Sequence, residues 1–182
     1  VLVFPEPQFG FTIVPDSGCS PLLVNFPSVI GAVQYLWNFG DGNTGSGPTP
    51  VHLYTNTTTN NQTFTIQLIA QSPFGCVDTT YGQVVVFPNP TAQFTIDSTA
   101  GCAPLSLNFT NTSTSASFFH WNMGNGTTFD TTLANFGYVF FNSTGIAQTY
   151  QTSLIAETMQ GCKDTVYQNV TVYPTITALF TY

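Results

Sequence analysis

Basic side chains are almost absent from this sequence. Lys163 is the one Lys or Arg among 182 residues, and charged residues make up only 5 %. Proteins that bind nucleic-acid phosphates use clustered Lys and Arg, so the composition excludes nucleic acid as a partner. Thr, Asn, Ser and Gln must keep the surface soluble, and trypsin-like proteases find one place to cut. Such a surface suits an exposed extracellular protein.

Long apolar runs are also lacking. No unbroken stretch approaches the roughly eighteen apolar residues of a transmembrane helix, so we expect no membrane insertion. With 42 % hydrophobic and 15 % aromatic residues, the sequence predicts a soluble globular protein. The first ten residues, VLVFPEPQFG, have neither the basic start nor the small-residue cleavage site of a signal peptide, which is typical of a mature protein or a fragment.

Close cysteine pairs of the form C-x-x-C, which are typical of metal sites, do not occur. The sequence contains four cysteines, each in a predicted loop beside a glycine: Cys19, Cys76, Cys102 and Cys162. An even set of this kind favours disulfides over metal ligation. Disulfides in turn predict an oxidising, extracytoplasmic location.

Three similar segments reveal an internal repeat: VLVFP, VVVFP and VTVYP end at residues 5, 88 and 174. This recurrence at about 85 residues predicts two full repeats. We place them at residues 6–88 and 89–174. The flanking residues 1–5 would be the last strand of a preceding repeat, and 175–182 the first strand of a following one.

Short segments within each repeat alternate apolar and polar residues between Pro and Gly, as in PLLVNF and TFTIQLIA. A period of two over four to eight residues indicates half-buried strands, and no segment has helical periodicity with caps. About seven strands per repeat predict an all-β fold of tandem immunoglobulin-like β-sandwiches.

The stretch WNFGDG at 37–42 has the appearance of a ligand-binding loop, and the second repeat has WNMGNG at 121–126. A phosphate-binding loop would open a helix, and a calcium loop would supply several oxygen ligands; Asp41 is alone and Asn125 has lost the charge. Asp-Gly and Asn-Gly both accept positive φ in a two-residue hairpin turn, so we interpret both as turns. The predicted core and turn residues are Trp37, Asp41, Gly42, Trp121, Asn125 and Gly126.

No active site is predicted elsewhere. His52 and His120 lie at different places in the two repeats without a second His nearby, which argues against a metal or general-base role. Asp78 and Asp164 occupy equivalent places and are interpreted as scaffold. We expect no catalytic residue, cofactor or metal, and no rise in melting temperature with micromolar calcium.

The order of motifs resembles the polycystic kidney disease (PKD) domain: GC-x-PL-x-x-NF, WNFGDG, an aromatic strand, GC-x-DT and V-x-V-F/Y-P. The best-known signature of that family is a tryptophan followed by D-F-G-D-G. The first repeat matches it at Trp37, Phe39, Gly40, Asp41 and Gly42. The second matches at Trp121, Gly124 and Gly126, with Asn122 and Met123 replacing Asp and Phe; Asn38 likewise replaces the first Asp. The resemblance covers essentially the whole chain.

The cysteine-bearing variant resembles repeat arrays in secreted surface proteins of Bacteroidetes, including gliding-motility adhesins exported by type IX secretion. It implies a structural stalk of a long adhesin or filament at the cell surface, and no enzyme. Neighbouring repeats of the same chain would be its partners, with surface polysaccharide or other surface proteins as further candidates. The alternative is an accessory carbohydrate- or protein-binding module or spacer of a secreted hydrolase. Extra aromatics in the second repeat would then bind the ligand: Phe118, Phe119, Tyr138 and Phe141.

Disulfide pairing depends on the strand count. With seven strands, Cys19 and Cys76 fall at opposite ends of a sandwich, as do Cys102 and Cys162, which disfavours pairs within a repeat because bridged Cα atoms lie within about 7 Å. Cys19 would instead meet Cys162 of the next repeat. With one strand fewer, the pairs are within repeats, and both alternatives stay open. In either case we expect all four cysteines to be oxidised.

Glycosylation is a further expectation. Asn56, Asn111 and Asn142 begin Asn-x-Ser/Thr sequons, which would be acceptors in a eukaryotic host. The resemblance to Bacteroidetes proteins implies instead O-glycans on Ser or Thr after Asp. The candidates are Thr79, Ser98, Thr131 and Thr165. Alternatively, each Asp-Thr merely begins a strand, with the aspartate closing the preceding turn.

Overall fold

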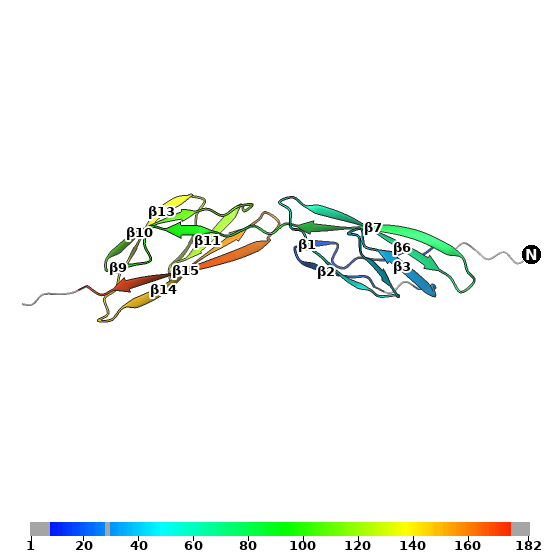
Figure 1. Cartoon of the computed structure of the whole chain (residues 1–182), viewed down its shortest axis with the longest axis horizontal. Helices are drawn as coiled ribbons and strands as arrows, with labels where there is room; N and C mark the ends of the chain where they lie inside the picture. Colours follow the sequence, from blue (N-terminus) through cyan, green and yellow to red (C-terminus); the bar gives the residue numbers. More distant parts are fainter. Residues whose placement is uncertain (1–7, 28–29, 176–182) are drawn as a thin grey trace, which may run out of the picture. The chain divides into compact units, whose positions relative to one another are not determined.

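The computed structural model of the chain describes residues 8–27 and 30–175. Two units, Val1–Pro88 and Asn89–Tyr182, make up the chain. The regular secondary structure of the described residues consists of β-strands alone (Figure 1). The flanking strands predicted at 1–5 and 175–182 lie outside the described residues, apart from residue 175.

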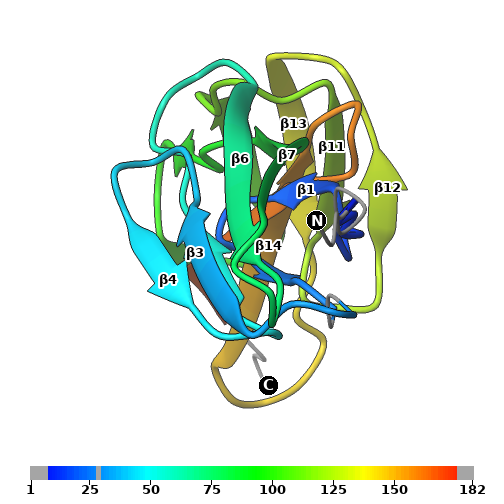
Figure 2. The same cartoon turned by 90° about the vertical axis from the view of Figure 1, so that its right-hand side faces the viewer.

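The first unit has seven strands in its described part, arranged in two sheets. One sheet has the order β1-β7-β6-β3-β4, and the other pairs β2 with β5. Figure 2 shows β4, β3, β6 and β7 side by side. The bounds are β1 (Ser17–Cys19), β2 (Leu22–Asn25), β3 (Gln34–Asn38), β4 (Thr44–Ser46), β5 (Val51–Tyr54), β6 (Gln62–Gln71) and β7 (Val77–Phe87).

The second unit repeats this plan with one more strand. Its sheets have the orders β12-β11-β14-β15-β9 and β13-β10-β8. The bounds are β8 (Phe94–Ile96), β9 (Ala100–Cys102), β10 (Leu105–Asn111), β11 (Phe118–Asn122), β12 (Thr128–Asp130), β13 (Asn135–Phe140), β14 (Gln148–Glu157) and β15 (Lys163–Tyr173). Both units are therefore immunoglobulin-like β-sandwiches.

Alternating side chains build the core of each unit. In β6, Ile66, Leu68 and Ala70 are buried while the residues between them are partly exposed, as period two requires. β14 repeats the pattern with Thr152, Leu154 and Ala156. The long hairpins β6–β7 and β14–β15 thus contribute one apolar face each.

A tryptophan lies in the core of each unit. Trp37 is fully buried, with its ring edge-on to Phe11 at 5.0 Å between centroids. Trp121 is 1 % exposed and meets Phe94 in the same way at 5.0 Å. Large aromatic bodies of this kind dominate core energetics, so these side chains hold the two sheets of each sandwich together.

The chain reaches each unit at one end of its longest strand and leaves from the other end. In the first unit, the backbone N–H of Phe9 donates to Asp78 Oδ2 near the start of β7 (2.8 Å), and β7 ends at Phe87. In the second, the N–H of Ala92 donates to Asp164 Oδ2 near the start of β15 (2.8 Å). Asp78 and Asp164 therefore anchor the incoming chain.

Candidate functional site

The glycine-rich stretch forms a loop of five residues, not the expected two-residue turn. Asn38 pairs with Thr44 across β3 and β4, which leaves residues 39–43 as the loop. Positive φ occurs at Gly40 (82°) and Gly42 (94°), and Asp41 is not among the positive-φ residues. The second unit has the same geometry at Gly124 and Gly126. The stretch connects two paired strands as predicted, but through a longer loop in which glycine alone takes the left-handed conformation.

Asp41 ties this loop to strand β5. Its carboxylate accepts hydrogen bonds from His52 Nε2 (2.7 Å) and from the backbone N–H and side-chain amide of Asn43 (3.0 Å each). Burial raises the pKa of Asp41, but the hydrogen bonds from His52 and Asn43 outweigh it and leave the pKa below its ordinary value. The His52 ring also stacks on Phe39 at 4.1 Å. The Asp41 carboxylate thus makes these hydrogen bonds with residues of its own unit.

The second unit makes the same tie with different side chains. Asn125 Nδ2 donates to the hydroxyl oxygen of Tyr138 (3.0 Å). His52 pairs with Val24 across β2 and β5, and Tyr138 pairs with Leu107 across β10 and β13, so the two aromatic side chains are equivalent. An Asp–His pair in one repeat is therefore replaced by an Asn–Tyr pair in the other.

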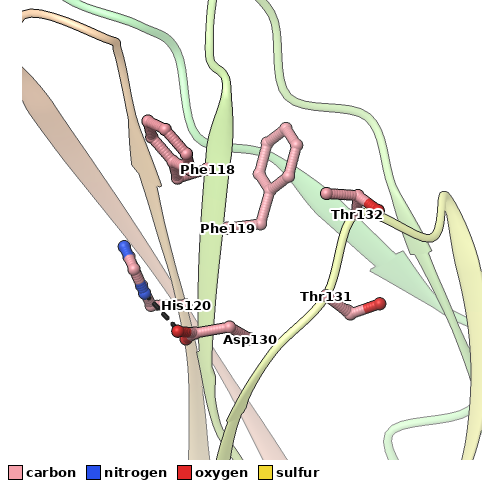
Figure 3. Close-up of a pocket in the computed structure, with 6 residues that line it drawn as sticks. All are labelled: Phe118, Phe119, His120, Asp130, Thr131 and Thr132. Carbon is pink, nitrogen blue, oxygen red and sulfur yellow. Dashed lines mark hydrogen bonds and ion pairs between the residues drawn. The ribbon is translucent and has the colours of Figure 1, made fainter.

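A pocket of about 400 Å³ opens beside β11 in the second unit. It is lined by Phe118, Phe119, His120, Asp130, Thr131 and Thr132. Figure 3 shows Phe118 and His120 on one side of β11, with Phe119 on the other side, toward Thr132. An aromatic surface beside carboxylate and hydroxyl oxygens can stack on a sugar ring and accept hydrogen bonds from its hydroxyls.

The four aromatic candidates do not form one platform. Phe118 and Phe119 line the pocket from β11, whereas Tyr138 lies in β13 of the other sheet and bonds Asn125. Phe141, which follows β13, is 71 % exposed and is not among the residues that line the pocket. Sequence reasoning named the two phenylalanines and, as a glycosylation candidate, Thr131, but missed Asp130 and Thr132.

His120 lies between two carboxylates. Its Nδ1 is 2.7 Å from Asp130 Oδ1, and its Nε2 is 3.1 Å from Glu157 Oε2. Lys163 Nζ approaches the same Glu157 oxygen at 3.2 Å. The hydrogen bond with Asp130 raises the pKa of His120 above its ordinary value, although burial opposes it and Glu157 adds to it. With both ring nitrogens engaged, His120 has no nitrogen available as a general base.

The raised pKa of His120 gives a testable pH dependence. The imidazolium stabilises the folded second unit fully below the unfolded pKa of about 6.5, and this contribution is lost as pH rises through the folded pKa. We expect an NMR titration of His120 to give a midpoint above 6.5, and the Asp130→Asn variant to lower it. A midpoint that Asp130→Asn leaves unchanged would contradict this account.

The indole N–H groups of the two tryptophans differ in their hydrogen bonding. Trp37 Nε1 donates to the carbonyl oxygen of Gly47 (2.9 Å), whereas Trp121 Nε1 is buried with no hydrogen-bond partner among the described residues. The segment after β12 follows a different path in the second unit, where Thr131 donates its backbone N–H to the Phe119 carbonyl oxygen (3.3 Å). The pocket lies at this difference between the units.

The cysteines are not all oxidised in the structure. Cys19 and Cys162 are disulfide-bonded, whereas Cys76 and Cys102 are free thiols. The expectation of four oxidised cysteines does not hold within this chain, and neither within-repeat pair, Cys19–Cys76 or Cys102–Cys162, forms. The reason is that the two cysteines of each unit lie at opposite ends of its longest strand, β7 or β15.

The O-glycosylation candidates differ in their exposure to solvent. Thr79, Thr165 and Ser98 are exposed, and Thr131 is partly buried in the pocket lining. The carboxylates before Thr79 and Thr165 accept hydrogen bonds from the backbone N–H of those threonines at 2.7 and 2.9 Å. This contact agrees with the turn-closing interpretation of Asp-Thr, while modification of the four residues stays a prediction.

Two further observations concern metals and membranes. In residues 8–27 and 30–175, no group of three or more His, Cys, Asp or Glu side chains is placed to hold a metal ion. The same residues contain no helix that is long and apolar enough to cross a membrane.

The described architecture defines the class of immunoglobulin-like β-sandwich modules. More particularly, residues 25–86 match the family model of the PKD domain. A PKD-type domain in a chain with disulfide-bonded cysteines suggests an extracellular location.

Solved structures give partial likenesses. The PKD1 domain of the Vibrio cholerae metalloprotease PrtV is 25 % identical, covers 47 % of this chain and 98 % of its own, and has a TM-score of 0.38. The PKD1 domain of Vibrio anguillarum Epp is 21 % identical over 46 % of this chain and 96 % of its own, with a TM-score of 0.36. A Ca²⁺-stabilised, ice-binding adhesin of an Antarctic bacterium is 12 % identical over 94 % of this chain and 50 % of its own, with a TM-score of 0.45. A search of curated proteins found no match.

Proposed function

We propose that the two units are load-bearing structural repeats in the stalk of a long bacterial adhesin or filament at the cell surface. Such a stalk serves adhesion or gliding motility and has no catalytic activity of its own. Its main partners are neighbouring repeats of the same chain. The observation that carries the proposal is the parallel pairing of a strand near the start of each unit with the strand that ends it.

This pairing sets how each unit responds to force. β1 runs parallel to β7, with Ser17 opposite Val85 and Cys19 opposite Phe87. With the disulfide at Cys19 reduced, force drawn along the chain pulls β1 from its beginning and β7 from its end, so the two strands are loaded in shear. All hydrogen bonds between them must then break together. β9 and β15 repeat the arrangement in the second unit.

Single-molecule pulling tests the proposal. Pulling from the two termini in a reductant, so that no disulfide at Cys19 or Cys162 carries the load, should give one unfolding step for each unit at high force, because shear slows forced unfolding. As a control, the first unit is pulled through tethers at Gln62 and Phe87. These lie at the open end of the antiparallel β6–β7 hairpin, whose hydrogen bonds would break one after another at a much lower force. Equal forces in the two geometries would contradict a load-bearing role.

A second candidate is binding of surface polysaccharide in the pocket beside β11. It is favoured by the lining of that pocket, which combines the aromatic ring of Phe118 with the polar side chains of Asp130 and Thr132. Phe118→Ala should reduce retention on a polysaccharide affinity gel at least tenfold, since stacking and burial on an aromatic ring contribute about 1.5 kcal/mol or more. Phe141→Ala is the matched control, because Phe141 is exposed and does not line the pocket. Equal losses from both variants would exclude the pocket.

A further inference from the structure

The four cysteines are of two kinds, according to their place in the fold. The first kind ends the short parallel strand: Cys19 lies opposite Phe87, and Cys102 lies opposite Tyr173. The second kind directly precedes the longest strand: Cys76 before β7 and Cys162 before β15. Each unit therefore has one cysteine at either end of its longest strand.

Both first-kind cysteines are held in the same way. The residue after each cysteine donates its backbone N–H to a carbonyl oxygen at the end of the longest strand. Ser20 donates to Phe87 (3.0 Å), and Ala103 donates to Tyr173 (2.9 Å). The residue before each is a glycine that lies close to a leucine side chain. A Cβ at Gly18 or Gly101 would come within 2.6 or 2.5 Å of that leucine. Cys102 is thus presented as Cys19 is.

The second-kind cysteines also share one loop geometry. The N–H of Cys76 donates to Ser72 Oγ (3.2 Å), and the N–H of Cys162 donates to Thr158 Oγ1 (3.1 Å). The carbonyl oxygens of Cys76 and Cys162 accept from the N–H groups of Ser72 (2.8 Å) and Thr158 (2.9 Å) in return. Cys76 is thus presented as Cys162 is.

Each kind contains one disulfide-bonded cysteine and one free thiol. Cys19 and Cys162, one of each kind, are disulfide-bonded, while Cys102 and Cys76, again one of each kind, are free thiols. Cys102 is exposed and Cys76 is partly exposed, whereas bonded Cys162 is only 1 % exposed. Two positions with the backbone hydrogen bonds of bonded cysteines therefore carry free thiols that are at least partly exposed.

Cys76 and Cys19 cannot pair within the first unit, and the same holds for the second. The strand between the two positions has eleven residues, so about 36 Å separates their ends. Bridged cysteines need Cα atoms within about 7 Å. A free thiol at either position therefore needs a partner from another unit.

We propose that Cys102 of one copy of this chain forms a disulfide with Cys76 of a second copy and so joins the copies end to end. This inference rests on the proposed stalk function, in which unit follows unit. The proposed bond joins a first-kind and a second-kind cysteine, and the bonded cysteines of this chain likewise comprise one of each kind. The partner is a second copy of this chain, and in a longer array the same bond joins successive repeats.

The bond requires an oxidant, for which oxidised glutathione is sufficient. The thiolate of Cys102 attacks the glutathione disulfide, forms a mixed disulfide and releases one reduced glutathione. The Cys76 thiolate of the second copy then attacks the cysteine sulfur of that mixed disulfide and releases the other. Two protein thiols are oxidised, and one glutathione disulfide is reduced to two thiols.

Two single-cysteine variants test the direction of the bond. Cys76→Ser retains only the Cys102 thiol, and Cys102→Ser retains only Cys76. In a glutathione redox buffer, we expect the unmodified chain to form a ladder of dimers, trimers and larger species on non-reducing gels. Each variant alone should remain monomeric. An equimolar mixture of the two should form dimers and stop there.

Controls separate this bond from unspecific oxidation. The double variant Cys76→Ser/Cys102→Ser should remain monomeric, and a reductant should collapse the ladder. Dimerisation of each variant alone to the extent of the mixture would overturn the proposal, as would an oxidised chain without a ladder. The pulling experiment is made on single chains, so a low unfolding force would refute the stalk role without affecting the ladder, and an absent ladder would leave the force result intact.

Discussion

Replacing Gly40 by alanine is expected to unfold the first unit, whereas the same change two residues later should be tolerated. Gly40 and Gly42 both have positive φ, at 82° and 94°, where a Cβ costs about 1–2 kcal/mol. At Gly42 the Cβ would enter open space. At Gly40 it would collide with the backbone oxygen of Thr65 in β6. Because Thr65 lies in a paired central strand, neither side can move away.

The expected loss at Gly40 is about 4 kcal/mol or more, comparable to the whole stability of a small domain. Calorimetry of the intact chain should show that Gly40→Ala removes the unfolding transition of the first unit and leaves that of the second. Gly42→Ala should keep both transitions and lower the free energy of unfolding of the first unit by about 1–2 kcal/mol. Gly124→Ala should act on the second unit, because its Cβ would lie 2.6 Å from the Gln151 oxygen. Equal losses for Gly40→Ala and Gly42→Ala would contradict the close approach.

Strands and sheet faces could be predicted because their signal is local. In β6, the alternation of Ile66, Leu68 and Ala70 with partly exposed neighbours is visible in the sequence itself. The burial of both tryptophans likewise follows from an aromatic residue in an alternating strand. β1 and β9, by contrast, have three residues each, too few to display a period. They pair with strands more than sixty positions later, so the pairing that loads the unit in shear could not be predicted.

The candidate site depended still more on contacts between distant residues. In the sequence, Asn125 of the second repeat stands where the first repeat has Asp41, which indicates only that a charge is lost. The structure shows that the partner changes as well, from His52 to Tyr138, so both repeats retain the tie between loop and strand. That compensation becomes visible only when the register of β2–β5 is compared with that of β10–β13.

The Asn-x-Thr sequons have a structural cause that the sequence alone concealed. Asn142 is 4 % exposed, and its amide donates to the carbonyl oxygens of Ile146 (2.9 Å) and Val172 (2.7 Å). Its side-chain oxygen accepts from the N–H and hydroxyl of Thr144. Asn56 repeats the whole arrangement with Thr58, Asn60 and Val86. Both asparagines clamp a loop onto the last strand, and a glycan on the amide nitrogen would break this clamp.

Asn142→Asp is therefore expected to destabilise the second unit by about 4 kcal/mol at neutral pH. The change removes two hydrogen bonds of about 1 kcal/mol each and sets a carboxylate against the carbonyl oxygens of Ile146 and Val172. Asn111→Asp is the matched control. Asn111 accepts from the N–H of Ser113 (3.0 Å), which a carboxylate also does, and its amide makes no hydrogen bond within the described ranges.

Denaturant unfolding of both variants at pH 7 and pH 4 measures the difference. Burial against carbonyl oxygens should raise the pKa of the new carboxyl at position 142, so its penalty is present at neutral pH and shrinks as acid protonates it and restores one donor. Asn111→Asp should unfold within about 0.5 kcal/mol of the unmodified chain at neutral pH, because a carboxylate keeps the hydrogen bond that Asn111 accepts from Ser113. If Asn142→Asp were as mild as Asn111→Asp, the clamp would not contribute to stability, and the sequon at Asn142 would again be open to modification.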